Sequence, residues 1–196
     1  MNKTKLLLID ITFDLLYKRG YCATGLMDIL KEANLTKGAM YYHFTNKNEL
    51  VLATMQHYIG YMLNSHWIEP LDEADKPVEK LVTQINALYA LYASKDAFLD
   101  VKHGCPLNNF INDMSNKEEE FFRYLQDIYA QWQESIEKAL TKAQILKQTK
   151  KDFNPKEQAL FIMSSIEGSI TSAKAYNNLP SLKISFDILN KYIQEL

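Results

Sequence analysis

Residues 24–50 contain two short segments of helical periodicity separated by a sharp break, the strongest local pattern in this 196-residue chain. The first segment repeats apolar side chains at the i, i+3, i+4 and i+7 spacing of one helix face: Leu26, Ile29, Leu30 and Ala33. Asn34 follows at once, and asparagine tolerates the left-handed backbone with which a helix ends sharply. Met40 and Phe44 form the apolar pair of the second segment. The pattern predicts a helix-turn-helix.

The second segment presents side chains that the major groove of DNA accepts. Small residues let the backbone approach base edges, a lysine offers a cation, and polar-tipped rings suit phosphates and thymine methyls. The predicted base-edge contacts come from Thr36, which also caps the helix, Lys37, Gly38 and Ala39. The predicted phosphate contacts come mainly from Thr24, Tyr41, Tyr42, His43 and Lys47. Asn46 with Glu49 three residues later predicts that a further helix starts directly after this surface.

The same region carries a longer signature. Its residues are Gly20-Tyr21, Ala23-Thr24-Gly25-Leu26, Asp28-Ile29-Leu30, Ala33, Thr36-Lys37-Gly38-Ala39-Met40-Tyr41-Tyr42-His43-Phe44, Lys47 and Leu50. In these residues the chain resembles the TetR family of transcriptional regulators. Two departures are visible: Asn34-Leu35 stands where Gly-Val is commoner, and Gly25 replaces a frequent Ser or Thr. The resemblance implies a homodimeric regulator, more often a repressor than an activator, that binds a double-stranded DNA operator.

The rest of the chain has helical periodicity throughout. Helices are predicted over residues 4–19, 46–66, 77–94 and 121–140, with others that start at Pro155 and after Pro180. Residues 69–77 are expected to be an acidic linker. Apolar residues make up 47% of the chain and Gly and Pro are few, so disorder is not expected. The sequence predicts an all-α fold of about nine helices: a helix-turn-helix DNA-binding domain (residues 1–46) and an effector-binding and dimerisation domain (residues 47–196).

Charge is unevenly distributed along the chain. Residues 1–50 carry seven Lys and Arg against five Asp and Glu, a net charge of +2, whereas the remainder carries 15 against 19, a net charge of −4. Affinity for nucleic acid is therefore expected in the first 50 residues, although chance explains such a difference equally well. With no export or membrane segment evident and only two cysteines, we expect a soluble, cytoplasmic protein.

The last two predicted helices carry stripes suited to packing against another helix. An apolar stripe steps by four and three residues: Leu182, Phe186, Leu189, Ile193 and Leu196. Small side chains line one ridge at Ser165, Gly168 and Ser172. Both stripes fit a four-helix interface between two copies, and equally the core of one copy; the family resemblance favours the homodimer. Two recognition helices about 34 Å apart then reach successive major grooves of a palindromic site.

Aromatic residues are frequent in the middle of the chain, where the family resemblance implies an effector site. The candidate pocket residues are Tyr61, Trp67, Tyr89, Tyr92, His103, Cys105, Phe110, Trp132 and Lys174, with Phe98 and Phe121 in the same region. Aromatic side chains at helical spacing are also normal core, so each assignment is a hypothesis. The expected mechanism is release: an effector that favours a tilted connecting helix changes the distance between the two heads.

One cysteine carries a more specific hypothesis. The segment His103-Gly104-Cys105-Pro106-Leu107 is similar to the Gly-Cys element of one TetR branch, which includes the repressor of N-ethylmaleimide reductase. A looser similarity extends from Glu167-Gly168 to Lys174-Ala175. In that branch, a cysteine at this place senses electrophiles or oxidants. A thiol near a helix start and a histidine has a physical route to a reactive thiolate, whereas a buried, inert thiol is the competing interpretation.

Other classes of protein explain less of the sequence. His103 and Cys105 hint at an enzyme, but no third orienting residue is identifiable by spacing. The histidines and cysteines show no metal-ligand spacing, so we expect no enzyme, cofactor or metal site. The alternative is an all-α small-molecule-binding protein or thiol-based sensor without direct DNA regulation. That alternative leaves the tyrosine pair Tyr41 and Tyr42 unexplained.

Overall fold

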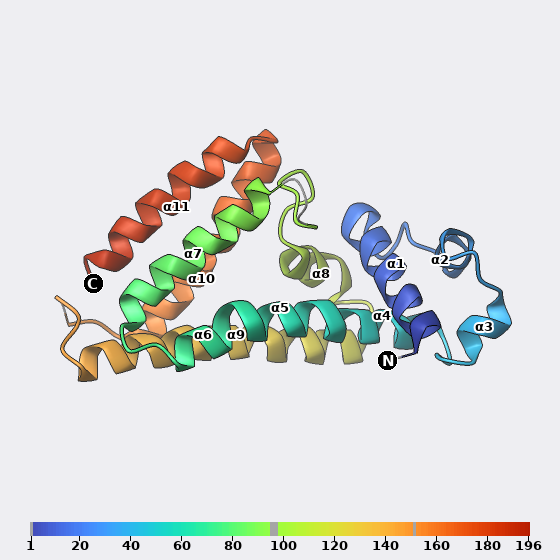
Figure 1. The fold of residues 1–196 in the computed structure, drawn as a ribbon, viewed down its shortest axis with the longest axis horizontal. Coiled ribbons are helices and arrows are strands. Elements are labelled where there is room, and N and C mark those ends of the chain that lie inside the picture. The colour runs from blue at the N-terminus through green and yellow to red at the C-terminus, as the bar shows by residue number, and fades with distance from the viewer. Residues whose placement is uncertain (1, 95–97, 151) are drawn as a thin grey trace. The chain divides into compact units, whose positions relative to one another are not determined.

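The computed structural model describes residues 2–94, 98–150 and 152–196, and within these ranges it contains helices and no strand (Figure 1). The predicted all-α class is confirmed. When the uninterrupted helical run from Lys47 to Asp72 is counted once, the described ranges hold nine helices. They form two compact units, one of Met1–Met62 with Pro106–Leu125 and one of Leu63–Cys105 with Gln126–Leu196.

The first unit begins with a helical head built around α1. Helix α1 (Lys3–Arg19) packs against α2 (Leu26–Glu32), α3 (Lys37–Tyr41) and α4 (Lys47–Met55). The apolar faces predicted for the two short helices meet in one core: Leu8, Ile9, Leu15, Ile29, Leu30, Ala33, Met40, Phe44 and Leu50. Burial of each large side chain contributes roughly 1.5–3 kcal/mol, which holds helices too short to be stable alone.

The helix after the head contains two wide turns. Helix α4 continues through a π-helical turn (Gln56–Gly60), α5 (Tyr61–Leu63), a second π-helical turn (Asn64–Ile68) and α6 (Glu69–Asp72). The Tyr124 hydroxyl donates to the Met55 carbonyl at the start of the first wide turn (3.3 Å). The predicted linker is wrong over residues 69–72, which are helical. Pro70 has no N–H to donate to the His66 carbonyl four residues before it, and that carbonyl instead accepts a hydrogen bond from the Gln84 side chain.

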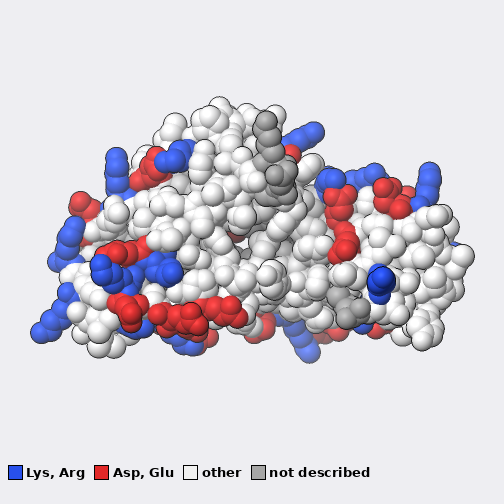
Figure 2. Space-filling view, in the orientation of Figure 1, with Lys and Arg blue, Asp and Glu red and all other residues white. Residues whose placement is uncertain are grey.

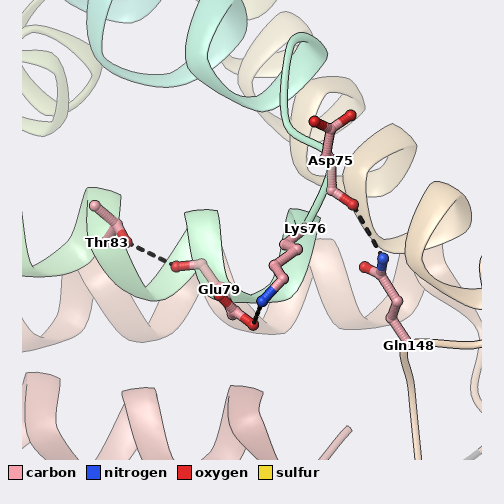
Figure 3. Close-up of polar contacts among 5 residues, drawn as sticks. All are labelled: Asp75, Lys76, Glu79, Thr83 and Gln148. Atoms are coloured by element: carbon pink, nitrogen blue, oxygen red, sulfur yellow. Dashed lines mark hydrogen bonds and ion pairs between the residues drawn. The ribbon is translucent and has the colours of Figure 1, made fainter.

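Three helices of the second unit pack together: α11 (Leu179–Gln194) lies against both α7 (Pro77–Ala93) and α10 (Pro155–Tyr176) (Figure 1). The predicted proline starts of α7 and α10 are confirmed. Around the start of α7, Lys76 Nζ contacts Glu79 Oε1 at 2.8 Å, and Gln148 donates to the Asp75 carbonyl at 3.0 Å (Figure 3). The remaining helices are α8 (Pro106–Met114) and the long α9 (Glu119–Ile145).

The apolar stripe predicted for a dimer interface is instead core of a single chain. All five of its members are buried within one copy: Leu182, Phe186, Leu189, Ile193 and Leu196. Helical spacing shows which side chains share a face but not which of two apolar faces turns inward. The face left exposed on α11 holds Ile184 (62% exposed) and Ile188 (63%). None of the described helices is sufficiently long and apolar to cross a bilayer.

Candidate nucleic-acid interface and thiol site

The turn between α2 and α3 is closed by the residues that the sequence singled out. Asn34 has a φ of 51°, and the Leu35 amide donates to the Leu30 carbonyl at 3.0 Å. The Thr36 hydroxyl accepts from the Ala39 amide at 3.2 Å, which satisfies an otherwise unpaired donor in the first turn of α3. The predicted left-handed asparagine and threonine cap are therefore confirmed.

The surface of α3 separates inward from outward side chains. Met40 and Phe44 are 0% and 2% exposed, whereas Tyr41 and Tyr42 are 52% and 83% exposed. Thr36, Lys37 and Gly38 are also exposed, and Ala39 and His43 are half-buried. Met40 lies on α3, and Phe44 follows in the turn after the helix, where its amide donates to the Met40 carbonyl at 2.9 Å; this hydrogen bond keeps both side chains on the inner side. Most of the predicted DNA-binding residues thus form one outward surface.

Two predicted DNA-binding residues have internal partners. Thr24 is only 1% exposed, and its hydroxyl donates to the Gly20 carbonyl at 2.8 Å. The half-buried Lys47 donates from Nζ to the Tyr21 carbonyl at 3.1 Å, and burial lowers the pKa of its ammonium group. Both side chains hold the turn between α1 and α2. Sequence spacing shows that such residues lie near the surface, but not that the protein itself uses their polar atoms.

A polar cluster that the sequence did not predict ties this turn to a distant segment. The Tyr21 amide donates to the Asp113 carboxylate on α8, 92 residues away. The Tyr21 hydroxyl donates to Asn48 at 2.7 Å, and Asn48 donates to Glu118 at 2.9 Å. No periodicity or motif links residues so far apart in sequence, and only the tertiary fold brings them together.

The predicted effector residues do not form one group. Tyr61 and Phe110 belong to the first unit; Tyr61 is 73% exposed, and Phe110 is buried with an edge contact to Phe13. Trp67 and Trp132 belong to the second unit, are buried, and have ring centroids 5.3 Å apart. Tyr89 lies half-buried beneath the Lys183 ammonium. A hollow on the second unit has none of these residues in its wall, which is formed by Ile68, Asp72, Gln131, Glu134, Ser135 and Lys138.

The segment around Cys105 lies against α10. The buried Tyr92 donates from its hydroxyl to the Gly104 carbonyl at 3.0 Å. Gly104 has a φ of 77° and a close neighbour, because an added Cβ would stand 2.9 Å from Lys174 Cδ. Only glycine combines that backbone with that approach. Of the predicted residues, Tyr92, Cys105 and Lys174 are therefore brought to one place, and Lys174 is itself exposed.

Glu167 is the residue at this place that sequence reasoning missed. The half-buried Cys105 thiol donates to Glu167 Oε1 at 3.2 Å. Glu167 is 8% exposed, and its other oxygen, Oε2, has no hydrogen-bond partner among the described residues. Burial raises the pKa of Glu167 to about 7, and the thiol hydrogen bond opposes part of that rise. A signal was present, since Glu167 follows Ile166 in the middle of a largely apolar helix face.

Charged side chains of both signs are mixed on the surface, and the described residues hold no cluster of metal ligands. On the face shown in Figure 2, Lys and Arg are interspersed with Asp and Glu and do not form one large patch. Within residues 2–94, 98–150 and 152–196, no three His, Cys, Asp or Glu side chains are grouped as metal ligands.

Comparison with known proteins identifies both parts of the chain. Residues 8–54 match the family described as bacterial regulatory proteins, tetR family, and residues 77–184 match the tetracyclin repressor-like C-terminal domain. An HTH-type transcriptional regulator in the lacX 3' region of Lactococcus lactis subsp. lactis is 27% identical over 100% of this chain and 96% of its own. The HTH-type transcriptional repressor DhaR of Mycobacterium sp. (strain GP1) is 25% identical over 82% of this chain and 77% of its own.

The fold agrees with solved structures. The reduced form of NemR from E. coli superimposes with a TM-score of 0.83 over 96% of this chain and 95% of that one, at 16% identity. A similar result is found for a transcriptional regulator from Cytophaga hutchinsonii, with a TM-score of 0.82 over 98% and 96% at 21% identity. Because one matching domain family alone covers more than half of the sequence, the chain belongs to the TetR family of helix-turn-helix transcriptional regulators.

Proposed function

We propose that this TetR-family regulator is a homodimeric repressor that binds a palindromic operator and leaves it when an effector binds. The DNA-binding site is supported chiefly by the exposure of Tyr41 and Tyr42 at the end of α3, while Met40 of α3 and Phe44 just after it are buried in the core. Thr36, Lys37, Gly38 and Ala39 are assigned to base edges, and Tyr41, Tyr42 and His43 to phosphates. Lys47 and Thr24 act chiefly by holding the adjoining turn in place.

The outer face of α10 and α11 supports the homodimer. Apolar side chains are exposed on both helices: Leu160, Phe161, Ile184, Ile188 and Tyr192. An added Cβ at Gly168 would meet no described atom within 4 Å, so a second backbone has room to approach this ridge. Exposed apolar patches of this kind are typical of protein–protein interfaces. The interface of the proposed dimer therefore uses the face opposite the buried α11 stripe.

The effector is assigned to the larger domain, residues 47–196, and is a small molecule or an electrophile or oxidant. The Cys105 site supports the second class, because Cys105 is only half-buried and its thiol donates a hydrogen bond to a carboxyl group. The same site supports the proposal that the chain is related to the branch that carries the Gly-Cys element. The DNA-binding domain is assigned to residues 1–46. A regulator of this kind is expected to act in the cytoplasm, where bacterial DNA lies.

The DNA-binding proposal is tested by fluorescence anisotropy with the DNA upstream of the protein's own gene. We expect binding that weakens steeply with salt, and Tyr42→Phe and Lys37→Ala variants that bind more weakly with unchanged melting temperatures. The matched control is Tyr176→Phe, an equally exposed tyrosine at the end of α10. Absence of salt-dependent binding to this and to other promoter fragments would contradict the proposal.

The electrophile branch is tested separately by adding a quinone to the protein–DNA complex. Release by the wild type and not by Cys105→Ser is the expected result, with Cys22→Ser as the control for the second free thiol. Equal release of DNA by the Cys105→Ser variant would contradict the proposal that Cys105 senses electrophiles. A chain that reacts at Cys105 but binds no DNA would instead be a thiol-based sensor without direct regulation, the alternative function.

A further inference from the structure

We propose that Glu167 is the proton acceptor that activates the Cys105 thiol for addition to a carbon electrophile. The inference rests on the proposed function only for the link between thiol addition and DNA release. The addition reaction itself can be measured on the protein without DNA. It assigns a role to a buried carboxyl group that neither the DNA-binding surface nor the predicted pocket uses.

The geometry of the pair supports the transfer. Cys105 Sγ lies 3.2 Å from Glu167 Oε1, within reach for direct passage of the thiol proton. The two groups come from different segments, Cys105 from the loop before α8 and Glu167 from the middle of α10. Their contact is therefore made by the tertiary fold. Cys105 as a residue is only half-buried, and the proposal is that a small neutral electrophile reaches its thiol from solvent.

The second oxygen of Glu167 makes the carboxylate a poorly satisfied anion. Oε2 is buried and has no hydrogen-bond partner among residues 2–94, 98–150 and 152–196. A desolvated carboxylate that lacks partners gains from taking up a proton. The same burial raises the pKa of Glu167 to about 7, so at neutral pH a substantial fraction is ionised and able to act as a base.

Three further titratable groups belong to the elements around the pair, and the first is His103, which lies two residues before Cys105 in the same loop. Lys174 lies two turns after Glu167 on α10, and its side chain packs against Gly104, the residue before Cys105. Tyr129 of α9 is close enough to both acidic groups for them to raise its pKa, an effect added to that of burial. The phenol thus stays neutral near pH 7. Glu167 is the group to which the thiol donates at 3.2 Å, and it is therefore the base that the geometry supports.

The proposed step is a redox-neutral addition to an electron-poor alkene such as a quinone or an α,β-unsaturated carbonyl compound. Cys105 Sγ forms a bond to the β-carbon while its proton passes to Glu167 Oε1. The π electrons of the carbon–carbon double bond move onto the carbonyl oxygen as an enolate. Glu167 then returns the proton to the enolate, and the net change is addition of S–H across the double bond with no external oxidant.

The test measures the second-order rate constant for alkylation of Cys105 by acrylamide, followed by intact-protein mass in a Cys22→Ser background. Glu167→Gln is expected to lower this constant about 100-fold at pH 7.5, within the range for loss of a general base. Glu167→Asp keeps a carboxylate but places it one methylene further from the thiol. Its rate constant should therefore lie between those of the parent and of Glu167→Gln. Glu157→Gln, an exposed glutamate in the first turn of α10, is the matched control and should react like the parent.

The pH dependence separates a base from a structural role. The parent rate constant should rise through an inflection near pH 7 as Glu167 ionises, and the Glu167→Gln variant should lack this inflection. Equal or faster alkylation of Glu167→Gln would overturn the proposal, because Glu167 would then restrain the thiolate by like charge. Equal losses in the Gln and Asp variants, with the inflection retained, would also overturn it. DNA affects neither measurement, so failure of the operator proposal is distinguishable.

Discussion

Lys47 lies over the ring of Tyr21, with Nζ 3.9 Å from the ring centroid and 3.1 Å from the Tyr21 carbonyl oxygen. The first residue of α4 is thereby fixed to the turn that leads from α1 into the helix-turn-helix. Cation–π contacts and hydrogen bonds from charged donors each contribute about 0.5–3 kcal/mol, so this one side chain has a measurable effect on the geometry of the head.

Replacing Lys47 by alanine should weaken binding to all DNA by a similar factor. The reason is loss of a fixed turn, together with any phosphate contact, and neither depends on base sequence. The free energy of unfolding should fall by about 1–2 kcal/mol. Titrations on an operator and on unrelated DNA test the first expectation, and urea denaturation tests the second. Lys37→Ala is the control, since exposed Lys37 should change DNA affinity without changing stability. A loss confined to particular operator sequences would refute the role of Lys47.

Tyr42 and Phe44 should respond to alanine substitution in opposite ways. Tyr42 is 83% exposed, so Tyr42→Ala should change the free energy of unfolding by less than about 0.5 kcal/mol while lowering DNA affinity. Phe44 is 2% exposed, so Phe44→Ala should cost about 3–5 kcal/mol of stability by leaving a cavity in the head. Thermal unfolding and anisotropy on the same samples compare the two. A large destabilisation by Tyr42→Ala would show that α3 faces inward.

Glu167 should make the protein less stable as the pH rises. Its pKa is about 7 in the folded chain against an ordinary 4.5, so the unfolded chain loses this proton first. The neutral carboxyl group makes its full contribution to the free energy of unfolding below pH 4.5, and this contribution is lost as the pH rises from 4.5 to 7. A shift of that size corresponds to about 3 kcal/mol. Glu167→Gln should therefore raise the free energy of unfolding at pH 8 by up to that amount and change it little near pH 4.5. An equal effect at both pH values would exclude this origin.

Gly168 should tolerate alanine within a single chain, but a bulky charged side chain there should disrupt the proposed dimer. In a single chain its Cβ would meet open space, so Gly168→Ala should stabilise α10 by up to about 1 kcal/mol through helix propensity. Gly168→Glu and Ile188→Glu should instead dissociate the proposed dimer and remove operator binding. Analytical ultracentrifugation measures the mass, with exposed Lys191→Glu as the control on α11. A dimer that survives both glutamate substitutions must use another surface.

Local patterns predicted local structure well. Asn34, Thr36, Asn46 and Asn154 form the helix ends expected of them, because turn and cap chemistry involves only neighbouring residues. The apolar faces of the two short helices were equally readable. Contacts between residues far apart in the chain could not be predicted, as the Tyr21–Asp113 and Cys105–Glu167 hydrogen bonds show. The α11 stripe illustrates the intermediate case, in which the periodicity was correct and the partner was not.

The two wide turns between Lys47 and Asp72 have a mechanical consequence. A π-helical turn accommodates one residue more than an α-helical turn, and each α-helical residue advances about 100° around the axis. Converting one wide turn to α geometry therefore rotates everything beyond it by about that angle in a single step. Such a change is a discrete rotation and not a gradual bend, and it leaves the helix intact.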